Sequence, residues 1–315
     1  SATPNYGREI FPEGVNLSAN LIGPAGGANP VLSNPTAFGS FTNGVATGTT
    51  FNWPEVGIIT LTPSVGDGDY LGVGDVSGTA SSNVGRFYPD HFIVTPVALT
   101  NRVLSDCSVF PKTASTFTYV GEQMELKDFH VIARNALATP TPTSNYATAN
   151  GFAKLDGTVF TNFGFGAVDL ADATPPLTAT PLTLDAALST SSGGWTDGDG
   201  TFTAKTAVTR TSHEGPYDTF WLGVLPVDTD GVTLRNADLN LDTTVPTNGD
   251  DRAKVISASG IVRFGRLRLE NAYGSELLPL PVPMTVQYWN GTAFVTNTAD
   301  SCTQLSAANI GFANY

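Results

Sequence analysis

The feature that most restricts the fold of this chain is the lack of any segment in which apolar residues recur at the helical period between helix caps. Only 14% of the residues are charged, whereas helices of soluble proteins usually carry Glu, Lys and Arg on their outer faces. The 33 glycines and 21 prolines favour turns, and abundant Thr, Ser and Asn suit the outer faces of strands. The sequence therefore predicts an all-β protein.

Alternating apolar and polar residues indicate where the strands lie. At 13–23, the side chains of Val15, Leu17, Ala19 and Leu21 share one face. Spacers such as "ATPTPTSN" and "STSSGGWTDGDG" have the composition of turns. Further strands are expected at 51–65 (broken at Pro54), 86–96, 116–120, 124–136, 151–160, 200–211, 217–227, 252–257, 261–269, 283–290, 292–296 and 307–312.

The strands and linkers divide the chain into three units. We expect tandem immunoglobulin-like β-sandwich domains at 1–84, 85–249 and 250–315, the second of them larger and with long loops. The last unit is well short of the roughly 100 residues of such a domain and is expected to be short or incomplete. An incomplete sandwich leaves an open sheet edge on which a partner strand can pair.

The net charge excludes some partners. With 28 acidic and 15 basic residues the chain carries −13, which disfavours binding to nucleic acid. No apolar run reaches the length of a membrane-spanning helix. The chain begins at Ser1 without a signal peptide, so we expect a processed product or a fragment.

Several segments resemble one bacterial family. "GRLRLENAYGSELLPLPVPMTVQYWNG" (265–291) and "FVTNTADSCT" (294–303) are similar to the C-terminal domain of unknown function in MshQ-like proteins. "GRFYPDHF", "FTYVGEQ", "NYATANGFAKL" and "LGVLPVDTDGV" resemble upstream landmarks of that family, in the same order. The resemblance implies an exported protein encoded with the mannose-sensitive haemagglutinin type IV pilus, and it supplies no catalytic residues. The family region usually continues beyond the Cys302 motif, which also favours an incomplete third unit.

Acidic turns are candidate calcium sites. Carboxylate and carbonyl oxygens are the ligands that calcium prefers, and "DTDG" and "DLNLD" supply them locally. The candidate ligands are Asp228, Asp230, Asp238, Asn240 and Asp242. The alternative is that these are ordinary hairpin turns. Calcium is the one cofactor that the sequence suggests, and no cofactor is certain.

Two further features suggest binding surfaces. Trp195 lies in a loop rich in Gly, Ser and Asp, where an exposed ring could stack on a sugar; the alternative is a core residue. Arg266 and Arg268 share one face of a strand, where they either form salt bridges with the neighbouring unit or face an acidic partner.

The two cysteines, Cys107 and Cys302, either form a disulfide or are unrelated buried thiols. Catalysis is not expected, because the adjacent Ser212, His213 and Glu214 would alternate between the faces of a strand and form no relay.

These observations predict an exported bacterial cell-surface, pilus-associated adhesive or structural β-protein without catalytic activity. One alternative is a filament or assembly subunit that a partner strand completes, with self-assembly through the open sheet edge. Another is a carbohydrate-binding or carbohydrate-active protein. The expected partners are other pilus or cell-surface proteins, or glycans.

Overall fold

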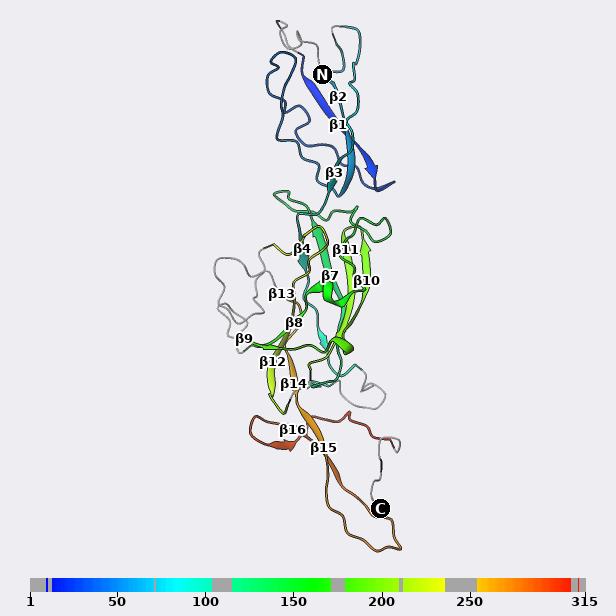
Figure 1. The fold of residues 1–315 in the computed structure, drawn as a ribbon, viewed down its shortest axis with the longest axis vertical. Helices are drawn as coiled ribbons and strands as arrows, with labels where there is room; N and C mark the ends of the chain where they lie inside the picture. The colour runs from blue at the N-terminus through cyan, green and yellow to red at the C-terminus, as the bar shows by residue number, and fades with distance from the viewer. Residues whose placement is uncertain are drawn as a thin grey trace.

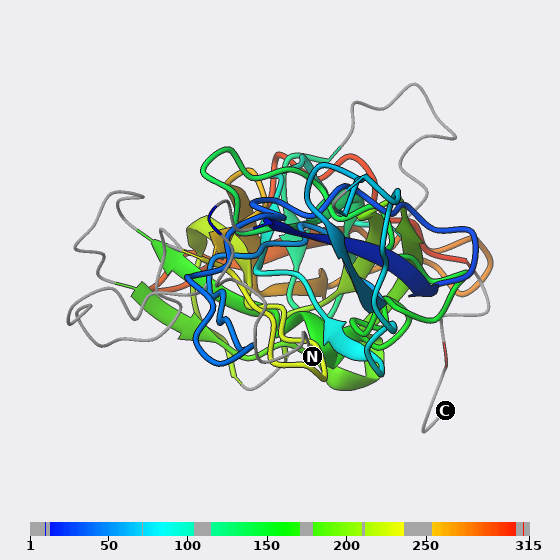
Figure 2. The same ribbon diagram turned by 90° about the horizontal axis from the view of Figure 1, so that it is seen from above.

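The computed structural model describes residues 10, 13–70, 72–103, 115–170, 179–209, 212–235, 254–306 and 311. Three groups of strands follow one another along the long axis, with the strands within residues 15–87 near one end and those within residues 265–289 near the other (Figure 1). Viewed along that axis, the three groups overlap (Figure 2). In the described residues the helices are two single turns, η1 (Phe160–Phe163) and η2 (Ala186–Leu188). The all-β prediction is therefore confirmed. Neither of these helical turns is long and apolar enough to cross a membrane.

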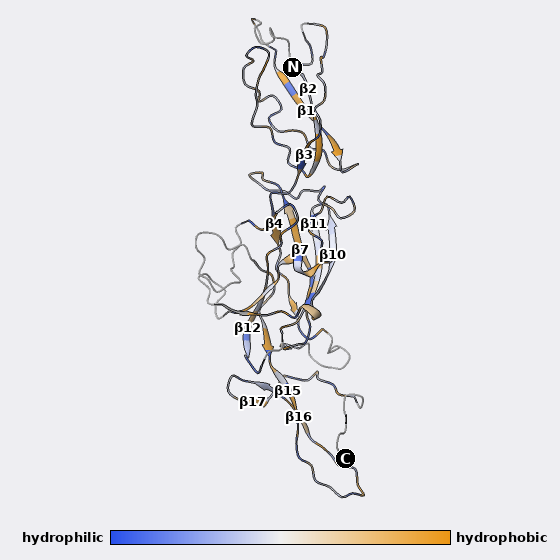
Figure 3. Ribbon diagram, in the orientation of Figure 1, coloured by the Kyte–Doolittle hydropathy of each residue, from blue (hydrophilic) through white to orange (hydrophobic). Residues whose placement is uncertain are grey.

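The N-terminal unit is one antiparallel sheet in the order β1-β2-β3, built from β1 (Val15–Gly23), β2 (Gly57–Val65) and β3 (Val84–Phe87). Hydropathy alternates along β1, as Figure 3 shows, so one face of the sheet is apolar. The chain between β1 and β2 covers part of this face, and Leu32 and Trp53 pack there against Leu17 and Ile59. This core is small.

The middle unit holds two sheets. The first has the order β10-β11-β7-β4, with β5 also paired to β7. The second has the order β6-β14-β12-β8-β9, with β13 also paired to β12. The first sheet consists of β4 (His91–Val94), β5 (Leu99–Thr100), β7 (Met124–Arg134), β10 (Thr190–Thr196) and β11 (Asp199–Thr206). The second consists of β6 (Thr118–Tyr119), β8 (Gly166–Leu170), β9 (Ala179–Leu182), β12 (Tyr217–Val224), β13 (Lys254–Val255) and β14 (Gly260–Arg263).

The sandwich core of the middle unit is aromatic. Phe129, Phe163 and Phe202 lie within 5.0–5.8 Å of one another, centroid to centroid, and all are buried. Gly157 lies against the ring of Phe202 so closely that a Cβ at this position would come within 2.0 Å of it. This is the largest continuous core of the described residues, and both neighbouring units attach to it.

The C-terminal unit is a three-stranded antiparallel sheet in the order β15-β16-β17, made of β15 (Gly265–Leu269), β16 (Met284–Trp289) and β17 (Phe294–Thr296). Only Phe264 separates β15 from β14, so the backbone passes almost straight from the middle unit into this sheet (Figure 1).

Two predictions differ from the structure, and some strands were not predicted at all. The segment 151–160 forms no strand, because Asp156 accepts hydrogen bonds from the Thr158 amide and hydroxyl and closes a turn. The segment 190–196, expected as a turn, is β10, and its glycines lie in a strand where Gly193 packs against Phe202. The sequence also gave no indication of β8 or β9. The strand predicted at 307–312 falls almost wholly outside the described residues.

Candidate functional site

Two networks of buried, hydrogen-bonded polar side chains lie where the units meet. We call the first the C-terminal joint and define it as Arg102, Tyr119, Glu122, Asn297, Asp300 and Thr303. Arg102 is at its centre, with a side chain that is only 2% exposed. Its guanidinium lies 2.9 Å from Asp300 Oδ1 and 2.9 Å from Glu122 Oε2. Arg102 and Glu122 belong to the middle unit and Asp300 follows β17, so this buried ion pair crosses the junction.

Asp300 is held by the chain around it. Its carboxylate accepts hydrogen bonds from the backbone amides of Cys302 and Thr303, both at 2.9 Å, and from the Thr303 hydroxyl. Burial alone would raise the pKa of Asp300, but these donors and Arg102 outweigh it and hold the pKa far below its usual range. Asp300 is therefore ionised at neutral pH and pairs with Arg102.

Tyr119 completes the C-terminal joint. Its hydroxyl donates to Asp300 Oδ2 at 3.0 Å and accepts from the Asn297 side-chain amide at 2.6 Å. Burial raises the pKa of Tyr119 well above its usual value. The backbone of Arg102 has a φ of 50°, in the left-handed region that non-glycine residues rarely adopt. Such a conformation persists only where its surroundings determine it, as the network does here.

The second site, the N-terminal joint, consists of Glu55, Arg86, Asn135, Asn145 and Asp230. Glu55 is 8% exposed, and it accepts from the amides of Val56, Ser144 and Asn145 and from the Ser144 hydroxyl, at 2.8–3.1 Å. A carboxylate of the N-terminal unit thus organises a loop of the middle unit. The side-chain amide of Asn145, in the middle unit, donates to the carbonyl oxygens of Ala28 and Val56 in the N-terminal unit.

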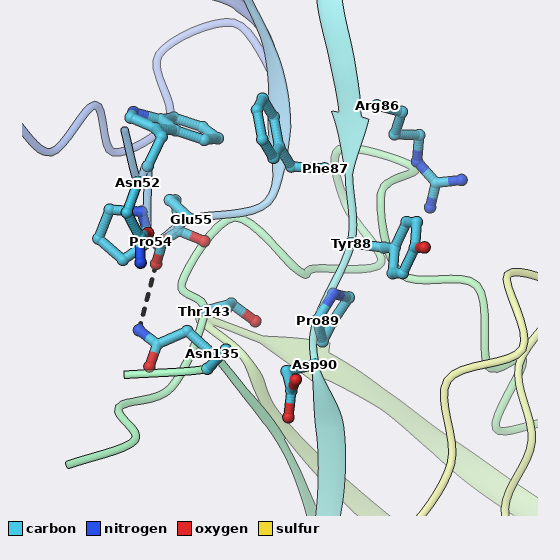
Figure 4. A pocket seen from close by; sticks show the side chains of 12 residues that line it. Asn52, Pro54, Glu55, Arg86, Phe87, Tyr88, Pro89, Asp90, Asn135 and Thr143 are labelled. Carbon is cyan, nitrogen blue, oxygen red and sulfur yellow. Dashed lines mark hydrogen bonds between the residues drawn. The ribbon is translucent and has the colours of Figure 1, made fainter. Parts of the chain in front are cut away.

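Arg86 and Asn135 connect the same two units. The Arg86 guanidinium pairs with Asp230, with Nη1 at 2.7 Å from Oδ1, and it also donates to the carbonyl of Phe152. The Asn135 amide donates to the Pro54 carbonyl at 3.2 Å (Figure 4). These contacts leave a cavity of about 340 Å³ between the units. Most polar groups that line it already bond to protein, so the cavity is mainly a feature of the joint.

Replacing Glu55 tests whether the N-terminal joint depends on this carboxylate. We expect Glu55→Ala to lower the free energy of unfolding by about 2–3 kcal/mol, because buried amide donors lose their acceptor. Glu55→Gln should cost less, since one oxygen remains. Thermal melts followed by circular dichroism would measure both. Glu13→Ala, in the same unit but away from the joint, is the control; equal melting temperatures for Glu55→Ala and the control would contradict the role.

The predicted calcium ligands fall into two groups. Asp228 accepts from the Tyr146 hydroxyl at 2.8 Å and from the amides of Asp230 and Val232, and burial raises its pKa. Asp230 is the partner of Arg86. Asp238, Asn240 and Asp242 lie outside the described residues. Among the residues that the structure describes, no group of three or more His, Cys, Asp or Glu could hold a metal ion.

The prediction that Trp195 is an exposed ligand contact is wrong. Trp195 lies in β10 and is 3% exposed, and its indole nitrogen donates to the Leu155 carbonyl at 2.9 Å. Its ring contacts Phe92, Tyr146 and Phe202. The loop composition is misleading because glycine and serine here occupy a strand beside a bulky aromatic core.

The arginines of β15 do share a face, and within the described residues neither forms an ion pair with the middle unit. Arg266 lies over the ring of Phe294, with its guanidinium carbon 3.8 Å from the centroid, and donates to Gln287. Arg268 pairs with Glu270 at 3.3 Å. Both contacts are internal to the C-terminal unit. Whether a partner uses this face stays a prediction.

Cys302 is disulfide-bonded. Cys107, the only other cysteine of the sequence, lies outside the described residues. Cys302 lies in the turn that Asp300 caps, so one end of the disulfide is anchored at the C-terminal joint.

The three histidines each contact a different residue. His91 and His130 lie 2.8 Å from Asp90 and Asp199, respectively, on different strands. His213 packs against Trp289 with ring centroids 4.4 Å apart. Each therefore has its own local partner.

Sequence reasoning missed both joints. One local signal was available: in Asp300-Ser-Cys-Thr303, an acidic side chain caps amides two and three residues later, a typical turn. Nothing in the sequence relates Arg102 to Asp300, because 198 positions separate them.

Comparison with known proteins places the chain in a family. Residues 55–254 match the model of DUF6701, third domain, and residues 263–315 match that of DUF6701, fourth domain. The first match begins just before β2, so it takes in part of the N-terminal sheet as well as the middle unit. No curated protein and no solved structure matches the chain. Since the two models together cover most of its 315 residues, the chain belongs to the DUF6701 family.

Proposed function

We propose that this chain is a structural component of the bacterial cell surface, which acts without catalysis as a stiff spacer between surface structures. The observation that carries the proposal is that both junctions between units are fixed by buried polar groups. A flexible linker of Gly and Ser would let the units move independently. Here Glu55 and Arg102 tie each end unit to the middle sandwich.

The cell-surface location and the association with a type IV pilus rest on the resemblance of residues 265–303 to MshQ-like proteins. The acidic, low-lysine composition is compatible with that location. Antibodies raised against the chain should label intact cells of the source bacterium without permeabilisation. Labelling that requires permeabilised cells would contradict the proposed location.

Stiffness has a separate test. Small-angle X-ray scattering of the monomeric chain should give a distance distribution that matches the extended arrangement in Figure 1. Substitution of Glu55 by alanine should broaden the distribution, because the N-terminal unit would then sample several orientations. A wild-type distribution as broad as that of the variant would contradict a spacer with fixed joints.

Glycan binding is a second candidate, and it now rests on Tyr88. The ring of Tyr88 is 59% exposed beside the cavity of the N-terminal joint (Figure 4). An exposed aromatic face can stack on the apolar face of a sugar. A glycan array probed with the wild-type chain and with Tyr88→Ala would decide it: only binding that the substitution abolishes would favour this function.

A further inference from the structure

The two end units of the molecule each carry an exposed apolar surface. At one end is a groove of about 710 Å³ in the N-terminal unit. Its floor is formed by neighbouring residues of β1 and β2, among them Val15 and Leu17 opposite Val65 and Pro63. This is the same sheet face that Trp53 and Leu32 cover elsewhere, so the groove is the uncovered part of that face.

The walls of the groove are apolar and partly aromatic. Phe38, Phe41 and Val45 line it from the loop between β1 and β2, and Tyr70 and Val76 line it from the loop after β2. Grooves of this size and composition are typical of sites that bury a ligand or a peptide segment. Val45 and Val76 remain 65% and 49% exposed.

At the other end is the hairpin of β15 and β16, which we call the C-terminal hairpin (residues 265–289). Eight of the 18 large apolar side chains exposed in the described residues fall between 267 and 284. They are Leu267, Leu269, Tyr273, Leu277, Leu278, Leu280, Val282 and Met284. Apolar clusters of this density on a surface mark interaction sites.

The proline-rich segment of the hairpin is suited to binding in a groove as an extended chain. Between Leu277 and Met284 three prolines alternate with Leu and Val, so φ is restricted at every second position. A segment that is already extended loses little conformational entropy on binding, and proline-rich segments dock in aromatic-lined grooves for this reason.

Within one molecule the hairpin cannot reach the groove, because the middle unit lies between them (Figure 1). The charges indicate which end of a second copy would dock there. Residues 13–85 include Glu13, Glu55, Asp67, Asp69 and Asp75 and no Lys or Arg. Two grooves facing each other would therefore bring together two loops with Asp67, Asp69 and Asp75 and no basic residue between them, which is unfavourable.

The C-terminal hairpin has no such conflict. Arg266 and Arg268 at its base balance Glu270 and Glu276, so the hairpin carries no net charge and brings no excess of negative charge to the acidic loop that contains Asp67, Asp69 and Asp75. We propose that the C-terminal hairpin of one copy binds in the N-terminal groove of the next, and that the chain assembles head to tail. An interface between two different surfaces, repeated from copy to copy, grows into an open filament when the rotation between neighbouring copies does not close a ring. This inference goes beyond the spacer function and does not depend on the location of the chain.

The test uses two variants that each block one surface. Val45→Glu puts a carboxylate into the groove, and Leu277→Glu with Leu278→Glu does so on the hairpin; all three side chains are exposed, so the fold should survive. Analytical ultracentrifugation of the wild type up to about 100 µM should show oligomers that grow with concentration. Each blocked variant alone should associate at least about tenfold more weakly.

Mixing the two variants gives the decisive result. The groove of the hairpin variant and the hairpin of the groove variant are both intact, so the mixture should form a one-to-one dimer and nothing larger. Val31→Glu is the control, because Val31 is 85% exposed in the N-terminal unit but does not line the groove. It should associate as the wild type does.

Three outcomes would overturn the proposal. The wild type could stay monomeric at every concentration. Val45→Glu could associate as strongly as the wild type, which would indicate pairing of hairpin with hairpin. The mixture could contain only monomers although circular dichroism shows both variants folded, which would indicate that hairpin and groove do not bind each other.

Discussion

The Asp300→Ala variant should lose about 3–5 kcal/mol of unfolding free energy, the cost of leaving a buried charge without its partner. The Arg102 side chain is 2% exposed and that of Asp300 is 1% exposed, so water cannot replace the lost carboxylate. Glu122 remains beside Arg102 but is 26% exposed and holds the guanidinium from one side only. The Tyr119 hydroxyl would lose its acceptor as well.

The Asp300→Ala substitution should loosen the C-terminal sheet under conditions in which the middle unit remains folded. With the C-terminal joint open, the sheet of β15, β16 and β17 should be cut by protease at concentrations that leave the wild type intact. Denaturant unfolding followed by circular dichroism and by tryptophan fluorescence would give the loss of stability. Glu270→Ala is the matched control, because Glu270 forms an exposed pair with Arg268 that contributes at most about 1 kcal/mol. Equal protease resistance of the two variants would contradict the role of Asp300.

The same carboxylate should give a pH signature. The pKa of Asp300 is lowered in the folded protein, so its stabilising effect is complete above the unfolded value of about 4 and disappears as the pH falls toward the folded value. Asp300→Asn cannot titrate. The difference in melting temperature between wild type and Asp300→Asn should therefore be constant at neutral pH and narrow below about pH 4. A difference that widens in acid would contradict this assignment.

Trp195→Ala should lower the stability of the middle unit by about 3–5 kcal/mol, the range for deleting a large buried aromatic side chain. The ring fills the space between Phe92, Tyr146 and Phe202, and its indole nitrogen bonds to the Leu155 carbonyl. Trp195→Phe should cost less, about 1–2 kcal/mol, because most of the volume is retained and one hydrogen bond is lost.

This second prediction also separates a core residue from a ligand contact. Chemical denaturation of the Trp195 variants and of Tyr88→Ala would measure their free energies of unfolding. Tyr88→Ala is the control and should change this free energy by less than about 0.5 kcal/mol, because Tyr88 is exposed. A Trp195→Ala variant as stable as Tyr88→Ala would show that the ring does not support the core.

The fold class could be predicted from the sequence because it depends on patterns that are local. The alternation at Val15, Leu17, Ala19 and Leu21 reports which side chains share a face, and β1 follows it. The same reasoning fails at Trp195, where the flanking glycines resemble a turn by composition. They lie in β10 because this segment pairs with β11, and position 193 is glycine because Phe202 of β11 occupies the space that a side chain there would need. Neither contact is visible in a local reading.

The joints could not be predicted for a related reason. Arg102 and Asp300 have ordinary neighbours in the sequence, and only the completed fold brings them together over 198 positions. Glu55 likewise finds its donors 89 and 90 residues later. Acidic turns such as Asp228-Thr-Asp230-Gly are conspicuous in the sequence, yet their oxygens bond to Tyr146, Arg86 and backbone amides.

The serial arrangement of the sheets determines how the molecule would respond to mechanical tension. A pull on the two ends of the long axis passes through the N-terminal joint, the middle sandwich and the C-terminal joint in turn, so each bears the full force (Figure 1). The aromatic sandwich has by far the largest core and should be the last to rupture. The two end sheets should unfold first. Unfolding of each sheet would lengthen the molecule while the middle unit stayed folded.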